Sequence, residues 1–129
     1  MRILVAEDVD DLREALKTLL TSEGHEVVAC RDGREALNEY RKARGANELF
    51  DWVITDFQMP FKNGIMVIME IRSVEPEQPI ILVSADPPKL GQQTKTLTGE
   101  FEVLQKPYKS EKLLELLKKP CDETAISDI

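Results

Sequence analysis

Short apolar runs alternate with amphipathic stretches along the chain. The apolar runs occupy residues 3–6, 27–29, 52–54, 80–83 and 101–104. Most are continuous in apolar character, which is typical of strands in a parallel sheet covered on both faces. The last run is the weakest, because Glu102 interrupts it. The alternation predicts an α/β fold of repeated strand–helix units around a parallel sheet.

Five helices are expected in the stretches that follow the strands. The first comes after Asp10 and Asp11, repeats leucines at helical spacing and stops at Gly24. The other four are expected after Gly33 as far as Gly45, after Gly64 as far as the residue before Pro76, within residues 88–98, and from Ser110 to about Lys119. The helix within residues 88–98 is expected to be short or mobile, because prolines at its start and three threonines disfavour it.

The length of 129 residues fits one domain with one site. We expect this domain to span residues 1–119. Pro120 closes the last helix, and residues 120–129 form an acidic tail without periodicity. We expect this tail to be disordered.

The charge and hydropathy of the chain argue against nucleic acids and membranes as its partners. A net charge of −7 and a pI near 4.8 leave no basic stripe, so no direct binding to nucleic acid is expected. The apolar run at the N-terminus is too short for a signal peptide, and no stretch approaches the roughly 20 apolar residues of a membrane span. We therefore expect a cytoplasmic protein that does not bind membranes.

Four of the five predicted strands end in a segment with a charged or hydroxyl side chain. In strand order these segments are Glu7-Asp8, Asp56, Ser84-Ala85 and Lys106-Pro107. Ligands of open α/β sheets bind outside the carboxyl ends of the strands, which lie along one edge. The sequence therefore predicts that three carboxylates, a hydroxyl and an ammonium group converge there.

This set of groups has a chemical rationale. Three carboxylates at close range repel one another unless a hard cation binds them, and Mg²⁺, or Mn²⁺ in its place, takes oxygen ligands. One carboxylate can then act as a nucleophile toward a phosphoryl donor and form an aspartyl phosphate. Lys106 would supply positive charge to the phosphoryl oxygens, and Ser84 a hydrogen-bond donor.

The four motifs together resemble the receiver domains of two-component response regulators, such as the stand-alone chemotaxis regulator. The matching motifs are Glu7-Asp8, the segment from Asp56 to Gly64, Ser84-Ala85 and Lys106-Pro107. The resemblance covers about residues 2–119. It implies a flavodoxin-like three-layer sandwich around a five-stranded parallel sheet of order 2-1-3-4-5.

The resemblance also implies a role for each site residue. Asp56 is the phosphorylated residue and binds Mg²⁺ directly together with Asp8, while Glu7 acts through water and the Gln58 carbonyl completes the ligands. Gln58 and Asp86 match the positions that tune attack of water on the acyl phosphate. The bond before Pro107 is cis in the family, and Ala85 belongs to the switch region.

One position departs from the family pattern. An aromatic residue commonly stands three residues before the lysine and acts as a rotamer switch coupled to Ser84, whereas this chain has Val103 there. Phe101 lies two residues earlier and points to the same face of a strand. Whether Phe101 replaces the missing aromatic group stays open at this point.

The resemblance implies a function in two-component or phosphorelay signalling. The domain would take a phosphoryl group from the phosphohistidine of a sensor kinase or phosphotransfer protein, and then present a switched surface to an unidentified protein target. It would catalyse its own phosphorylation and dephosphorylation rather than turnover of an external substrate. Two alternatives stay open: a haloacid-dehalogenase-like phosphatase with Asp8 as nucleophile, and a docking module that is never phosphorylated.

Overall fold

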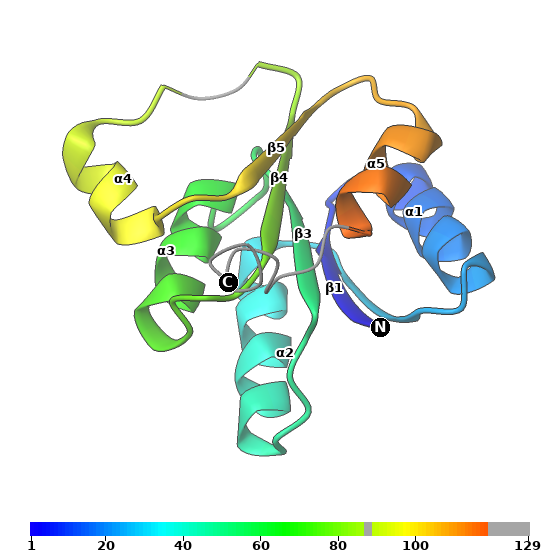
Figure 1. The fold of residues 1–129 in the computed structure, drawn as a ribbon, viewed down its shortest axis with the longest axis horizontal. Coiled ribbons are helices and arrows are strands. Elements are labelled where there is room, and N and C mark those ends of the chain that lie inside the picture. The colour runs from blue at the N-terminus through cyan, green and yellow to red at the C-terminus, as the bar shows by residue number, and fades with distance from the viewer. Residues whose placement is uncertain (87–88, 119–129) are drawn as a thin grey trace, which may run out of the picture.

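The structure is a computed structural model that describes residues 1–86 and 89–118 (Figure 1). In this part of the chain the strands are β1 (Arg2–Ala6), β2 (Glu26–Cys30), β3 (Trp52–Asp56), β4 (Ile80–Ser84) and β5 (Glu102–Gln105). The helices are α1 (Asp10–Ser22), α2 (Gly33–Gly45), α3 (Gly64–Val74), α4 (Gln92–Thr98) and α5 (Ser110–Leu117).

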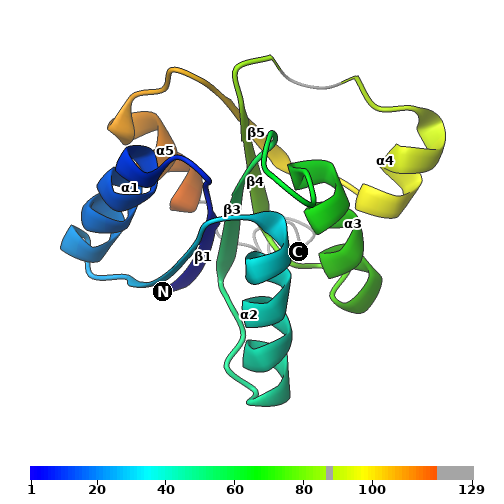
Figure 2. The same cartoon turned by 180° about the vertical axis from the view of Figure 1, so that it is seen from behind.

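The strands form one parallel sheet with helices on both sides. Their order is β2-β1-β3-β4-β5, and every neighbouring pair runs parallel. Helices α1 and α5 lie on one face of the sheet, and α2 and α3 lie on the other with α4 beside α3 (Figures 1 and 2). This arrangement confirms the predicted flavodoxin-like sandwich and its strand order.

Side chains of the central strands point alternately into two separate cores. Along β1, Ile3 and Val5 pack with the α1 and α5 side, whereas Leu4 and Ala6 pack with the α2 and α3 side. Strands β3 and β4 are buried at every position, as β1 is from Ile3 onward. Burial on both faces explains why these strands read as continuous apolar runs in the sequence.

Some element boundaries differ from the sequence prediction. Strand β5 begins at Glu102 rather than at Phe101, because its pairing with β4 starts where Glu102 meets Ile81. Helix α1 buries Leu16 and Leu20 but leaves Leu12 exposed. Helix α4 has seven residues, which agrees with the short helix expected within residues 88–98.

Part of the prediction concerns segments outside the described residues. These segments are residues 87–88, which include the prolines before α4, and residues 119–129, which include Lys119 and the predicted acidic tail. Among residues 1–86 and 89–118, no helix has the length and apolar character that crossing a membrane requires.

Gly64 brings the start of α3 against the end of β3. A Cβ atom at this position would lie 2.5 Å from the carbonyl oxygen of Asp56 and 2.7 Å from Cδ1 of Leu82. The Gly64 amide also donates a hydrogen bond to the Phe57 carbonyl at 2.8 Å. The absence of a side chain therefore allows the loop after Asp56 to close tightly over the sheet.

A Gly64→Ala substitution is expected to lower the free energy of unfolding by about 1 to 3 kcal/mol, because the new methyl group overpacks a closed site. Gly45→Ala is the matched control, since nothing lies within 4 Å of a Cβ at that position of α2. Urea denaturation of the three proteins measures the difference. Equal midpoints for Gly64→Ala and Gly45→Ala would contradict the close-packing argument.

A buried polar contact joins α2 to the segment before β4. The Tyr40 hydroxyl donates to Oε1 of Gln78 at 2.6 Å, and Nε2 of Gln78 donates to the carbonyls of Phe50 and Pro79, each at 3.1 Å. Tyr40 is 3% exposed and Gln78 is 4% exposed. Burial raises the pKa of Tyr40 from its ordinary value of 10.0 to about 12.

This pKa predicts a loss of stability at alkaline pH. The folded state favours the neutral phenol, so its contribution is fully present below pH 10 and is lost as the pH rises toward 12. Between these values the unfolding free energy of the native protein should fall by roughly 2 kcal/mol more than that of Tyr40→Phe. Urea denaturation across this pH range tests the prediction, and parallel curves for the two proteins would refute it.

Candidate functional site

The first strand delivers two carboxylates to the carboxyl edge of the sheet. Glu7 follows β1 directly, and its amide donates to the Cys30 carbonyl at 3.0 Å, which extends the β1–β2 pairing. Its side chain is buried and accepts a hydrogen bond from the Val9 amide at 3.1 Å. Burial raises the pKa of Glu7, while the Val9 amide and Lys106 act in the opposite direction. Asp8 lies nearer to solvent than Glu7.

The third strand ends in a buried aspartate. Asp56 is the last residue of β3, and its Oδ1 lies 3.0 Å from Nζ of Lys106. Burial raises the pKa of Asp56, and the hydrogen bond from Lys106 lowers it. The Phe57 amide donates to the Val83 carbonyl at 2.9 Å, so the backbone after Asp56 stays attached to β4.

Lys106 joins the carboxylates of two strands. It follows β5, where its amide donates to the Ser84 carbonyl at 2.9 Å, and its Nζ lies 3.3 Å from Oε1 of Glu7 as well as 3.0 Å from Asp56. Burial acts to lower the pKa of Lys106, but hydrogen bonds and charges of Asp56 and Glu7 outweigh it and raise the pKa. The peptide bond to Pro107 is cis.

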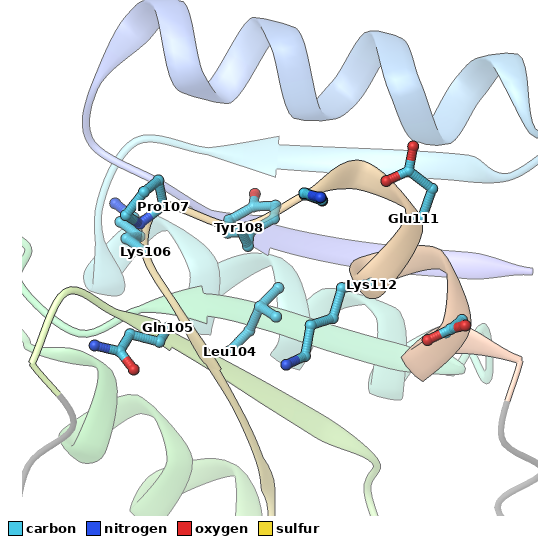
Figure 3. A pocket seen from close by; sticks show the side chains of 9 residues that line it. Leu104, Gln105, Lys106, Pro107, Tyr108, Glu111 and Lys112 are labelled. Carbon is cyan, nitrogen blue, oxygen red and sulfur yellow. The ribbon is translucent and has the colours of Figure 1, made fainter.

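Lys106 and Pro107 also lie at one end of a groove along β5 and α5. Leu104 and Tyr108 line this groove with them, and Figure 3 shows these four side chains following one another along the chain. Tyr108 packs on the core between the sheet and α5. Packing of Tyr108 on this core therefore holds the turn after β5 in place, and with it the backbone of Lys106.

The acidic cluster has the composition of a site for a hard divalent cation. Glu7, Asp8 and Asp56 each offer a carboxylate oxygen, and these oxygens all lie within 4.8 Å of one another. Carboxylates at this separation repel, and Lys106 offsets only part of their charge. An oxygen-only donor set of this kind fits Mg²⁺, which prefers carboxylates and water.

The fourth strand supplies the hydroxyl group of the site. Ser84 ends β4 and is buried; its Oγ donates to the Asp86 carbonyl at 2.9 Å and accepts from the Asp86 amide at 3.2 Å. Ser84 lines a cavity of about 440 Å³ in front of Asp56. The other residues of its wall are Phe57, Gln58, Ala85, Asp86, Lys89 and Lys106.

The structure thus brings nearly every residue of the predicted site to one edge of the sheet. Two residues of the predicted switch lie elsewhere. Val103 is 42% exposed and does not line the cavity, and Phe101 packs partly buried against the core of α2 and α3. The aromatic ring of Phe101 is therefore part of the hydrophobic packing in this structure.

Sequence reasoning missed one residue of the cavity wall, Lys89. It comes from the segment between β4 and α4, which has no regular structure at this residue. A lysine in such a segment carries no periodic signal that distinguishes it from the other surface lysines of the chain. Only its position three residues after Asp86 could have suggested a place near the site.

Comparisons with known proteins agree with this geometry. The chain is 32% identical to the chemotaxis protein CheY of Thermotoga maritima, over 92% of this chain and 95% of the relative. It is 31% identical to hybrid signal transduction histidine kinase I of Dictyostelium discoideum over 90% of this chain, but spans only 7% of that relative's length. A solved structure of the response regulator TrrA from Thermotoga maritima, in complex with Mg²⁺ and BeF, has a TM-score of 0.69 and 32% identity, covering 89% of this chain and 97% of that one.

The family comparison settles the class of the domain. The sequence model of the response regulator receiver domain matches residues 3–118, which cover the strands and helices described above except for Arg2, the first residue of β1. This match does not favour the haloacid-dehalogenase-like phosphatase considered from the sequence. The chain therefore belongs to the response regulator receiver domain family and is a receiver domain of two-component signal transduction.

Proposed function

We propose that this receiver domain accepts a phosphoryl group on Asp56, from a phosphohistidine of a sensor kinase or phosphotransfer protein. The observation that carries the proposal is the placement of the Asp56 carboxylate. It is buried, lies 3.0 Å from the Lys106 ammonium group, and shares a cluster with the carboxylates of Glu7 and Asp8. The similarity to a hybrid signal transduction histidine kinase supports a histidine-based donor.

Asp56 and Asp8 would bind Mg²⁺ directly, with Glu7 acting through water and the Gln58 carbonyl as a further ligand. The ion would neutralise charge on the carboxylates and on the incoming phosphoryl oxygens. The solved relative in complex with Mg²⁺ and BeF supports Mg²⁺ as the ion. Mn²⁺ fits the same oxygen donors.

In the transfer step, a carboxylate oxygen of Asp56 attacks phosphorus. The new O–P bond forms as the P–N bond of the donor breaks, and the electron pair of that bond returns to the imidazole nitrogen. Lys106 already contacts Asp56, so its ammonium group is in place to stabilise charge on the phosphoryl oxygens. The protein supplies position and electrostatics for this reaction rather than an additional reactive group.

Ser84 would couple the chemistry to the surface of the domain. Its hydroxyl now donates to the Asp86 carbonyl, at the start of the segment that leads toward α4. When that hydroxyl turns to donate to a phosphoryl oxygen instead, the Asp86 carbonyl loses its donor and the backbone at Asp86 can change its conformation. The output then runs through Ser84 and Ala85 without an aromatic group at Val103, and Gln58 and Asp86 set the rate of hydrolysis from the cavity wall.

Intact-mass measurement after treatment with a small phosphoryl donor and Mg²⁺ tests the site of transfer. The native protein should gain one phosphoryl group, and Asp56→Asn should gain none because it lacks the nucleophile. Asp8→Asn should be modified more slowly, at Asp56. Modification that persists in Asp56→Asn would support Asp8 as nucleophile, and an unmodified native protein would support the docking module that is never phosphorylated.

Binding of Mg²⁺ should stabilise the fold, because the ion binds the folded acidic cluster. A Mg²⁺ concentration 100 times the dissociation constant should raise the unfolding free energy by about 2.7 kcal/mol. Asp8→Asn should lose most of this increase, whereas Asp11→Asn, which removes the same charge from the exposed first turn of α1, should keep it. Urea denaturation with and without Mg²⁺ measures the effect, and equal losses in both variants would contradict a specific site.

A further inference from the structure

The cavity in front of Asp56 is larger than the transferred group needs. Its volume is about 440 Å³, and a water molecule occupies about 30 Å³ in the liquid. The cavity therefore has room for a phosphoryl group, part of its donor and several waters. Groups on the wall that the transferred phosphorus does not reach can still contact the donor as it enters.

The positive charge of Lys106 is already shared between two carboxylates. Its Nζ contacts Asp56 at 3.0 Å and Glu7 at 3.3 Å. A phosphoryl group brings three strong acceptor oxygens and additional negative charge. Even with Mg²⁺ bound at the acidic cluster, one shared ammonium group and the Ser84 hydroxyl leave lone pairs on the three phosphoryl oxygens that a further donor can occupy.

Lys89 is a second cation on the wall of this cavity. Within residues 1–86 and 89–118, its ammonium group takes part in no ion pair or hydrogen bond. The next residue, Leu90, packs partly buried against the core of α2 and α3, as Phe57 and Met59 of the loop after β3 also do. Leu90 therefore holds the adjacent backbone of Lys89 against this core, and Lys89 shares the cavity wall with Phe57 and Gln58 of the loop that follows Asp56.

We propose that Lys89 binds the phosphoryl group of the incoming donor at the mouth of the cavity, as a second cation beside Lys106. This inference rests on the proposed phosphorylation of Asp56. Lys89 has three N–H donors and makes no ion pair with a carboxylate of the described residues, so it can contact phosphate oxygens without breaking such a pair. It acts in binding of the donor, whereas Lys106 acts on the group being transferred.

This division predicts a separation of kinetic effects. Loss of Lys89 should raise the donor concentration at half-maximal rate and leave the maximal rate nearly unchanged, because the contact forms before the transfer step. The effect should weaken as salt is added, since the lysine is exposed and its charge is screened. A residue needed only for the fold would lower the fraction of active protein and would not change the half-saturating concentration.

The test is the rate of labelling by phosphoramidate with Mg²⁺, measured by intact mass over a range of donor concentrations. Lys89→Gln should raise the half-saturating concentration about three- to ten-fold, as expected for an exposed charge-assisted contact. Lys89→Arg should retain most of the native value. The matched control is Lys95→Gln, which removes the same charge from exposed α4 outside the cavity wall.

Two results would overturn the inference and leave phosphorylation of Asp56 intact. They are equal half-saturating concentrations for Lys89→Gln and Lys95→Gln, or a fall in maximal rate alone for Lys89→Gln. If the native protein is not labelled at all, the proposed function fails instead, and a beryllofluoride titration with Mg²⁺, followed by amide NMR shifts, replaces the labelling. If beryllofluoride binds Lys89→Gln more weakly than the native protein, the contact between Lys89 and the anion is supported. Equal binding to the two proteins, or no binding to either, overturns it.

Discussion

Repulsion among three carboxylates at the end of the sheet is the constraint on which the site depends. Glu7, Asp8 and Asp56 come from two strands, and their oxygens lie within 4.8 Å of one another. Burial alone would favour protonation of such a group, as the raised pKa values of Glu7 and Asp56 show. The ammonium group of Lys106, which follows a third strand, favours the charged form of Glu7 and Asp56. The site can therefore hold a carboxylate nucleophile and a cation-binding cluster together.

The parallel sheet makes this convergence possible at low cost. All the parallel strands end at the same edge of the sheet. A residue that directly follows one strand therefore lies close to the residues that follow the neighbouring strands. Backbone pairing continues past the strand ends at Glu7, Phe57 and Lys106, whose amides all donate to carbonyls of adjacent strands. The functional side chains are thus carried by backbone that is still part of the hydrogen-bonded scaffold.

Much of this could be predicted from the sequence, because parallel strands buried on both faces leave continuous apolar runs and are followed by polar residues. The strand order, the helices and the meeting of Asp8, Asp56 and Lys106 follow from that pattern and from the resemblance to receiver domains. The start of β5 could not be predicted in the same way, because Phe101 is as apolar as the strand but lies one residue before its first pair with β4, and packs on the core instead. Lys89 was missed because its place depends on how Leu90 packs, which no periodicity records.

The division of the interior into two cores has a consequence for how such domains can diverge. Because β1 directs Ile3 and Val5 to one side and Leu4 and Ala6 to the other, the sheet separates the packing of α1 and α5 from that of α2 and α3. Substitutions at well-separated positions that share no partners are close to additive in free energy. Substitutions in one layer can therefore accumulate independently of those in the other. Helices on one side of the sheet can acquire new binding partners while the opposite layer preserves the fold.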